Sequence, residues 1–515
     1  MLERRGVWLF LGTAVLYASF FGARLSWREW HGTVRLEASR EEYFHDEFVE
    51  LRLWSRDRGL AERLASKPQR VVVSRGGRVV RTVAGIEAVT LVRDPSSGVW
   101  AGRWPCPWNA PAGEYRLLLL SDAEIGERLR MRPFRVSYRK PAPIPEGLSV
   151  LTLESGDSLA EMKVASPSGE VKDWRGLLDW VEYVGADAFW MLGGETPGQG
   201  EGEVWQSRNF RLFPEVAREC RKRGIKFGLY AMCYLTNSKT VRLKRYEYAR
   251  EVEEGQTVET RAISLRDQGR PEDVAALLRQ FRDIPGVDYV GLDYIRNALG
   301  GYELVDDFVS EFPGVKTPEG WGSFSKEERM LWLGRKKSMR RDLALVDAWQ
   351  WWRAHRAAAV VRRIKAELGD ATPLWAFTLT WDKGWHHGQD PVMMNDAGVD
   401  VDALMLYEAD DEQFGVLLRD WNRYVRRSDV QLLVGDVIDW PLHQRSELGP
   451  RAFSGRLSSA MDRIYSDGPA RGVFFHDVGR ALWGRLGPWT TRQWLDEARR
   501  VSDRARALAK RRVGT

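Results

Sequence analysis

The chain has 515 residues, of which 43% are hydrophobic and 29% are charged, and its formal net charge is +6. This length is enough for about two or three domains with large cores, and the composition is that of a globular protein. The positive charge comes mainly from scattered arginines, so it does not predict a nucleic-acid-binding face. Cys106, Cys220 and Cys233 show no CxxC or Cys/His spacing, which argues against a disulfide framework or a zinc site.

The N-terminus carries a membrane signal. Residues 6–23 contain no charged side chain, and they lie between Arg5 and Arg24. Such a run is near the lower limit for a spanning helix and slightly long for a cleaved signal peptide. Because Phe20 and Phe21 stand where a cleavage site needs small residues, we interpret residues 1–28 as an uncleaved signal anchor, with a cleaved signal peptide as the alternative. The remainder is then expected outside the cytoplasm, anchored to the inner or cytoplasmic membrane, or secreted.

Residues 31–140 contain short runs in which apolar and polar residues alternate, separated by turn residues. This pattern predicts an antiparallel β-sandwich, with a hairpin turn at Gly76-Gly77. Segments 98–104 and 112–115 loosely resemble immunoglobulin-like modules of bacterial surface proteins. Nothing in this region is typical of catalysis, so we expect a spacer or a domain that binds an envelope protein.

A proline-rich joint at 141–145 separates this module from residues 146–515, where short apolar runs alternate with amphipathic segments. The amphipathic segments predict helices between strands and a final helix at 491–509. Eight strands in this alternation predict an α/β fold of the (β/α)8 TIM-barrel class, whose active site lies at the C-terminal ends of the strands. The predicted strands are 148–154, 186–192, 226–234, 288–295, 373–381, 401–408, 430–437 and 471–476.

The predicted strand ends carry many carboxylates and aromatic rings. The sequence DYVGLDYIR at 288–296 makes Asp293 the first functional candidate, because a buried strand delivers it to this end. The alternative is that Asp293 only caps the following turn. Paired carboxylates beside aromatic platforms are what glycosidic cleavage requires, and neither carboxylate role needs a metal. The other strand-end candidates are Glu154 with Asp157, Glu195, Tyr234 with Asn237, Trp381 with Asp382, Tyr407 with Glu408, Asp436 with Asp439, and His476 with Asp477.

Other chemistries find less support in the sequence. Adjacent His386 and His387 point in different directions on a regular backbone, so they do not predict a metal site. The glycine-rich stretch at 193–202 matches neither GxGxxG nor a Walker loop, and no Gly-x-Ser-x-Gly motif is present. We therefore predict no metal and no cofactor.

Three segments are similar to the glycosyl-hydrolase-like family ten of bacterial envelope proteins. These are 287–296 (VDYVGLDYIR), the helix at 349–368 with its Trp352-Arg353 pair, and the strand segment DALMLY ending at Tyr407. The chain departs from the family motif where Arg296-Asn297-Ala298 replaces Arg-Tyr-Pro, and an insertion at 299–345 follows. The resemblance covers the barrel and implies glycoside hydrolysis at the cell envelope.

The resemblance carries Asp293 over as a catalytic carboxylate. Its partner acid is expected to be Glu408, with Asp382 and Asp436 as the alternatives. Arg296 is expected either to keep Asp293 ionised, or to bind an anionic sugar, or simply to pair with Asp306 or Asp307. The remaining substrate-binding candidates are Tyr294, Tyr407 and His476, together with the possible sugar platforms Trp190, Tyr230, Trp381 and Trp385.

The expected substrate is an envelope or extracellular polysaccharide, such as an amino-sugar or anionic glycan, with the 299–345 insertion forming one wall of its groove. Two other functions stay open at this point. The barrel could bind carbohydrate without cleaving it, or the chain could be an envelope scaffold.

Overall fold

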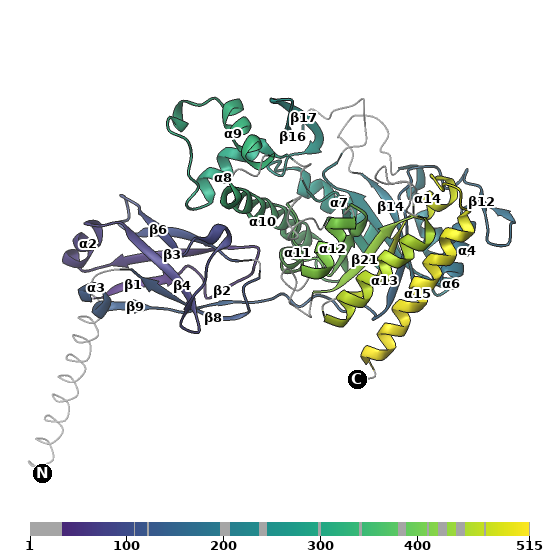
Figure 1. Cartoon of the computed structure of the whole chain (residues 1–515), viewed down its shortest axis with the longest axis horizontal. Helices are drawn as coiled ribbons and strands as arrows, with labels where there is room; N and C mark the ends of the chain where they lie inside the picture. The colour runs from purple at the N-terminus through teal and green to yellow at the C-terminus, as the bar shows by residue number, and fades with distance from the viewer. Residues whose placement is uncertain are drawn as a thin grey trace, which may run out of the picture. The chain divides into compact units, whose positions relative to one another are not determined.

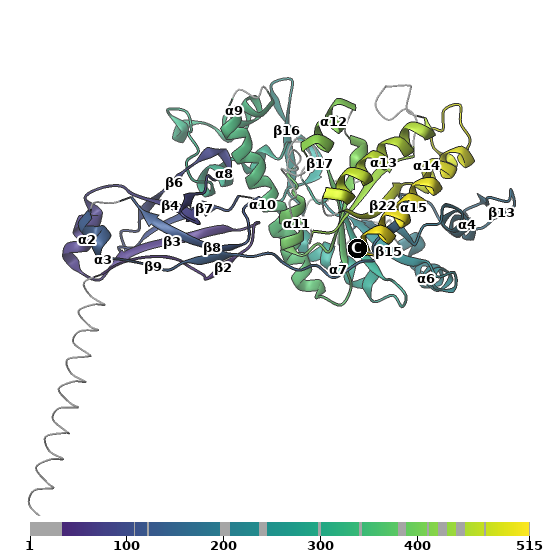
Figure 2. The same cartoon turned by 60° about the horizontal axis from the view of Figure 1, so that its bottom comes forward.

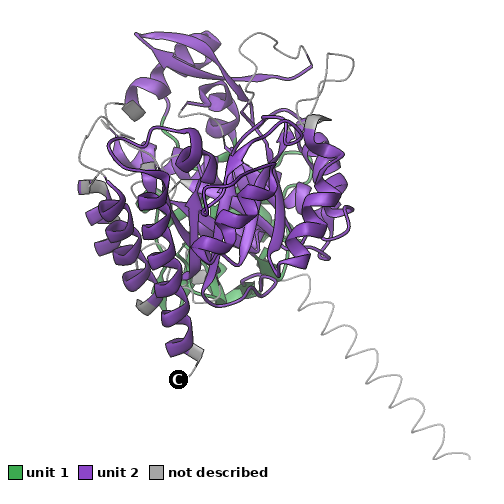
Figure 3. Cartoon of the chain, turned by 90° about the vertical axis from the view of Figure 1, so that its right-hand side faces the viewer, with its two compact units in different colours: residues 1–43, 47–137, 311–316 green, residues 44–46, 138–310, 317–515 purple. Residues whose placement is uncertain are grey.

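The computed structural model describes most of the chain outside its N-terminus, and the chain divides into two compact units (Figure 3). Unit 1 comprises residues 1–43, 47–137 and 311–316, and unit 2 comprises 44–46, 138–310 and 317–515. The described residues are 33–107, 109–120, 123–195, 207–235, 245–296, 300–338, 342–379, 388–408, 411–420, 430–438, 449–467 and 470–513.

Unit 1 is a β module. Its strands form one hydrogen-bonded path in the order β2-β10-β8-β4-β6-β7-β3-β1-β9, with β5 paired to β4. The bounds are β1 (Val34–Ala38), β2 (Glu42–Tyr43), β3 (Phe48–Ser55), β4 (Gln69–Arg75), β5 (Arg78–Val79), β6 (Ala88–Arg93), β7 (Trp100–Pro105), β8 (Gly113–Leu119), β9 (Leu129–Met131) and β10 (Phe134–Val136). Most pairs are antiparallel, as predicted, whereas β1–β9 and β2–β10 are parallel. The continuous path differs from the two separate sheets expected, and it does not show an immunoglobulin fold.

The core of unit 1 follows from alternation along its strands. Leu51 and Leu53 on β3 are fully buried, and the exposed Glu50 and Arg52 alternate with them. The predicted turn is present, since Gly76 and Gly77 both have positive φ and join β4 to β5. Two short helices, α2 (Arg58–Ala65) and α3 (Ala123–Arg128), were not predicted.

Unit 2 contains a closed barrel of eight parallel strands (Figure 1). Each predicted strand has a counterpart, because buried parallel strands are near-continuous apolar runs that stand out between helices. The predicted barrel is therefore confirmed. The strands are β11 (Leu148–Leu153), β14 (Ala188–Glu195), β15 (Lys226–Met232), β18 (Tyr289–Asp293), β19 (Leu374–Leu379), β20 (Val401–Met405), β21 (Leu432–Val437) and β22 (Ala470–His476).

Large aromatic side chains fill the barrel interior. Trp190 on β14 stacks on Trp375 of β19 with 3.9 Å between ring centroids, and neither side chain has exposed area. Tyr230 on β15 is also fully buried, with its ring edge-on to Trp375 at 5.3 Å. A sugar platform must expose one ring face, so the prediction that Trp190 and Tyr230 are platforms is wrong. Their rings instead form the packed core that an eight-stranded barrel requires.

Helices surround the barrel as the alternation predicted. Gly185, in the left-handed conformation, ends α4 after a helix with six buried residues. Figure 2 shows α13 and α15 side by side, and both contact β22. The principal helices are α4 (Arg175–Val184), α6 (Phe213–Lys222), α7 (Arg270–Arg282), α10 (Leu343–Leu368), α12 (Asp411–Asp420), α13 (Pro450–Asp467) and α15 (Thr491–Val513); the shorter α5 (Ser207–Phe210), α11 (Pro391–Ala397) and α14 (Val478–Trp483) lie between them.

Two insertions leave the C-terminal end of the barrel. A hairpin of β16 (Tyr248–Glu253) and β17 (Gln256–Ile263) follows β15, and η2 (Tyr302–Leu304), α8 (Val305–Glu311) and α9 (Lys326–Ser338) follow β18. The buried Glu303 ties the two together, because it accepts hydrogen bonds from Arg250 N and Ser264 Oγ, both at 2.7 Å. The hairpin was not predicted.

No helix in the described part of the chain is long and apolar enough to cross a membrane. The predicted anchor at 6–23 lies outside the described residues.

Candidate active site

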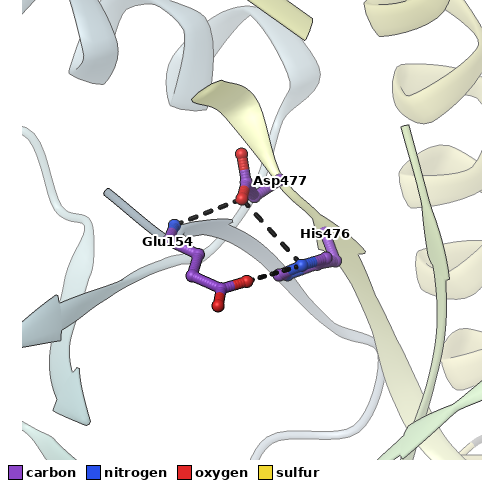
Figure 4. A group of neighbouring side chains, drawn as sticks. All are labelled: Glu154, His476 and Asp477. Carbon is purple, nitrogen blue, oxygen red and sulfur yellow. Dashed lines mark hydrogen bonds and ion pairs between the residues drawn. The ribbon is translucent and has the colours of Figure 1, made fainter. Parts of the chain in front are cut away.

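Three polar side chains meet where β11 and β22 end (Figure 4). His476, the last residue of β22, lies with Nε2 3.0 Å from Glu154 Oε2 and 4.0 Å from Asp477 Oδ2. The parallel register pairs Leu151 with Phe475, so the residues that follow, Thr152 and His476, are also neighbours. Because side chains alternate along a strand, His476 shares the inward face with Phe474 of the barrel core. The cluster therefore lies at the C-terminal mouth of the barrel.

Asp477 connects the ends of β11 and β22 through two hydrogen bonds. Its Oδ1 accepts a hydrogen bond from Arg480 N at 2.8 Å and so caps α14, and its Oδ2 accepts from Glu154 N at 3.2 Å. Asp477 is thus a positioning group, which ties the backbone at the end of β11 to the end of β22.

Asp293 reaches the same mouth from β18. It lies two residues after Gly291, whose absent side chain makes room for the Trp375 ring inside the barrel, so Asp293 also points inward. Its Oδ1 accepts a hydrogen bond from Tyr294 N at 2.7 Å, and the residue is 5% exposed. The predicted first candidate is therefore buried at the mouth of the barrel.

The two carboxyl groups have opposite pKa shifts. Burial, followed by the negative charge of Glu154, raises the pKa of Asp293 from 3.8 to about 7. Burial also opposes ionisation of Glu154, but the hydrogen bond and charge of His476 outweigh it, and the pKa of Glu154 falls below its ordinary value. Burial disfavours the cationic form of His476, yet Glu154 and Asp477 raise its pKa overall. Near neutral pH the site thus holds an ionised Glu154 beside an Asp293 that is still about half protonated.

Two tyrosines adjoin these groups. The ring of Tyr407 stacks on the His476 imidazole, with 5.4 Å between centroids and an interplanar angle of 11°. Burial raises the pKa of Tyr230 well above its ordinary value, and the charges of Glu154, Asp293 and Asp477 raise it further. Since one hydroxyl responds to all three carboxyl groups, they lie within electrostatic reach of a single point. Of the two, the half-buried Tyr407 is the one able to touch a ligand.

Asp436, an alternative predicted as the partner acid, points the other way. Gly435 faces Phe474 inside the barrel, so the next residue along β21 faces outward. There Asp436 Oδ2 pairs with Arg456 Nε of α13 at 3.0 Å, and its Oδ1 accepts from Val437 N. Asp436 is therefore an ion-pair partner behind the barrel wall, and its prediction as a catalytic acid is wrong.

The remaining predicted residues are placed only in part. Tyr294 and Arg296 follow Asp293, with the Arg296 guanidinium carbon 4.8 Å from the Tyr294 ring centroid. Glu408 ends the turn η4 (Leu406–Glu408), but its side chain is not described. Trp381, Asp382 and Trp385 lie outside the described residues. Their predicted roles stay predictions.

The cluster at the mouth also contains residue types that bind metals. One ligand atom each from Glu154, His476 and Asp477 lie within 4.8 Å of one another. However, both Asp477 oxygens already accept backbone N–H groups, and one Glu154 oxygen is bonded to His476. The hydrogen-bonding capacity of these groups is thus already used within the protein, which fits an acid-base cluster better than a metal coordination shell.

Glu154 and Asp477 are among the predicted strand-end residues but not among the predicted catalytic or substrate-binding residues. One signal could have selected Glu154, since it lies at even spacing from Leu148, Val150 and Thr152. Residues at this spacing share one face of a strand. Asp477 offered no such signal, because it belongs to the turn after β22.

No family model matches the chain, and no curated protein matches its sequence. Among solved structures, similar chains include a β-glucuronidase from Bifidobacterium dentium (TM-score 0.34, 10% identity, 92% of this chain and 67% of that one). A β-galactosidase from Rahnella sp. R3 is also similar, with a TM-score of 0.44 and 11% identity over 72% of this chain and 58% of that one. A GH53 catalytic domain from Ignisphaera aggregans has a TM-score of 0.37 and 11% identity over 71% of this chain and 99% of that one. The chain thus spans little more than half the length of the β-galactosidase.

These neighbours are glycoside hydrolases, but the TM-scores and identities are too low to assign this chain to a family or an activity. They do not show glycosyl-hydrolase-like family ten. The fold assignment rests on the closed strand order of the barrel itself.

Proposed function

We propose that the chain is a glycoside hydrolase in which Asp293 is the general acid and Glu154 is the second carboxylate. The observation that carries this proposal is the pair of opposite pKa shifts on two inward-facing carboxyl groups at one barrel mouth. Glycosidic cleavage needs one protonated and one ionised carboxyl group at the same pH, and environments that drive two pKa values apart supply that pair.

Each group then has a defined task. Asp293 gives its proton to the glycosidic oxygen as the bond breaks. Glu154, kept ionised by His476, either attacks the anomeric carbon or takes a proton from the attacking water. His476 and Asp477 position Glu154, and the ring of Tyr407 fixes the imidazole plane.

The expected substrate is a polymer of the cell envelope or extracellular matrix. This part of the proposal comes from the sequence, where an uncharged run at 6–23 precedes the β module and the barrel. We propose that this run anchors the chain with its barrel outside the cytoplasm. The β module would act as a spacer of immunoglobulin-like type or bind an envelope protein, and the family-ten resemblance of the barrel implies hydrolysis at the cell envelope.

Release of reducing ends from a panel of soluble polysaccharides tests the activity. We expect turnover by the wild-type chain and a loss of about 100- to 10,000-fold in Glu154→Gln. Asp157→Asn is the matched control, because Asp157 is exposed on the loop that follows Glu154. Full activity of Glu154→Gln would contradict the assignment. Tight glycan binding without turnover by the wild type would favour a carbohydrate-binding barrel instead.

A further inference from the structure

The strongest feature not used by the proposed mechanism is the guanidinium of Arg296, three residues beyond Asp293. Tyr294 takes a positive φ of 49°, which turns the chain sharply as β18 ends. Its carbonyl accepts a hydrogen bond from Tyr234 N at 3.1 Å, so the turn is held to the neighbouring strand segment. The Arg296 guanidinium then lies over the Tyr294 ring at 4.8 Å. The turn at Tyr294 therefore places the Arg296 guanidinium close to Asp293.

This guanidinium keeps unused hydrogen-bonding capacity. Its Nη1 atom is buried and has no hydrogen-bond partner within the described part of the chain. The positive charge of Arg296 acts on Asp293, where it partly offsets the rise in the pKa of that acid. Burying a charged donor without an acceptor is unfavourable, so such an atom is suited to an acceptor that arrives with a ligand.

A second buried cation makes this region more positive. Arg353 on α10 is fully buried, with its guanidinium bonded to Gln350 Oε1 at 3.2 Å and lying 5.7 Å from the Trp349 ring centroid. Burial lowers the pKa of Arg353 to about 10 against the raising effects of Tyr302, Glu303 and Glu251, and the positive charge of Arg296 adds to the lowering. The two cations thus interact electrostatically, and Asp293, which also interacts with Arg296, is only about half ionised at neutral pH. A ligand anion would reduce this repulsion.

We infer that Arg296 is the anion-recognising residue of a sugar subsite beside the acid, and that the substrate carries a carboxylate there, as uronic acid units do. The inference rests on the proposed function for the position of the scissile bond. A guanidinium presents a planar fork of N–H groups that matches a carboxylate in a bidentate pair. Because the Tyr294 ring covers one face of the guanidinium, we expect the ligand carboxylate to approach in the guanidinium plane, at the buried Nη1 that has no acceptor in the described part of the chain.

Binding to a silenced enzyme tests the subsite separately from turnover. The full chain carrying Glu154→Gln is titrated calorimetrically with oligosaccharides of polygalacturonate, alginate and hyaluronan. The same preparations with their carboxylates reduced to alcohols are the neutral ligands, and sulfated dextran oligosaccharides test another anion. Each titration is repeated with Arg296→Gln or Arg296→Lys added, and with Arg279→Gln as the control. Arg279 is an arginine of α7 that pairs with Glu367.

We expect at least one uronate preparation to bind better than its reduced form. Arg296→Gln should weaken that binding by about 10- to 100-fold, the loss for one charge-assisted pair, while leaving the reduced ligand unaffected. Arg296→Lys should restore it only in part, because an ammonium cannot form the fork, and Arg279→Gln should change nothing.

Binding of uronates that ignores Arg296, or stronger binding of the reduced or sulfated ligands, would overturn the inference. Failure of every uronate preparation to bind would overturn it as well. The proposed function fails independently, when the wild-type chain hydrolyses none of the ligands that the silenced chain binds. Cleavage of neutral glycans by the wild-type chain, with no uronate preparation binding to the silenced chain, would reject the subsite and leave the hydrolase assignment intact.

Discussion

Asp293 at the end of β18 and Asp436 at the end of β21 look alike by every local measure. Each is 5% exposed, and each accepts a hydrogen bond from the backbone N–H of the next residue, at 2.7 Å and 2.8 Å. They differ in the face of the barrel wall that they occupy. Asp293 faces Glu154 and His476 across the mouth, whereas Asp436 faces Arg456 on α13.

Burial at a strand end does not by itself make a carboxyl group reactive. Asp436 has a cation within 3.0 Å that neutralises it. Burial raises the pKa of Asp293 to about 7, and the anionic Glu154, its principal charged neighbour, adds to this rise. A carboxyl group that holds a proton near neutral pH can donate it, and one that is locked in an ion pair cannot.

The largest expected effect separates the two residues by activity. Asp293→Asn keeps the bond from Tyr294 N but cannot donate the proton, so we expect turnover to fall by about 100- to 10,000-fold. Asp436→Asn should keep most of its turnover per folded molecule. Initial rates of both purified variants on one substrate make the comparison. Equal losses in the two would remove Asp293 from the mechanism.

The pH profile sharpens the same comparison. Activity requires a protonated Asp293 and an ionised Glu154, so kcat/KM should rise at low pH as Glu154 ionises and fall as pH passes about 7. Asp436→Asn should keep this alkaline fall, while the residual activity of Asp293→Asn should lack it. Profiles measured from pH 3 to 9 decide this. An alkaline fall that survives in Asp293→Asn would assign the titration to another group.

For folding stability we expect the opposite order, with Asp436→Asn more affected than Asp293→Asn. Asp436→Asn removes the carboxylate charge that faces the Arg456 guanidinium, whose side chain is 11% exposed. We expect a loss of about 1–3 kcal/mol in the free energy of unfolding. Asp293→Asn should lose far less stability at neutral pH, because it replaces an acid that is already about half protonated and keeps the hydrogen bond from Tyr294 N. Urea unfolding monitored by Trp fluorescence compares the variants, and a less stable Asp293→Asn than Asp436→Asn would reverse the roles argued for them.

The strands could be predicted because they are short, near-continuous apolar runs, but the same property does not reveal which way each side chain points. In β18 and β21 every residue is buried, so apolar alternation does not reveal the inward face. Glycines do reveal it. Gly291 and Gly435 face Trp375 and Phe474 inside the barrel, so Asp293 at even spacing shares their face and Asp436 at odd spacing does not.

Other features of the site lie beyond local sequence. The bond between Glu154 and His476 joins the first and last strands of the barrel, 322 positions apart, and exists only because the barrel closes. Trp190 and Tyr230 could not be told from platforms by residue type, because a barrel interior and a sugar subsite both select aromatic rings. How deep a ring lies in the barrel determines whether it packs in the core or can contact a sugar. That depth depends on how neighbouring strands are shifted along one another.

The smallest expected effect concerns the pH dependence of stability. The folded-state pKa of Asp293 is raised above its ordinary value of 3.8, so folding favours its protonated form. The stability that this group contributes is therefore complete below about pH 4 and is lost as pH rises through about 7. Asparagine cannot ionise, so Asp293→Asn should become progressively more stable relative to wild type between these limits, reaching a few kcal/mol at most because Glu154 titrates with it. Melting temperatures of the two proteins at pH 4, 6 and 8 measure the trend. A constant difference across this range would mean that Asp293 keeps an ordinary pKa, and the distinction from Asp436 would then have to rest on geometry alone.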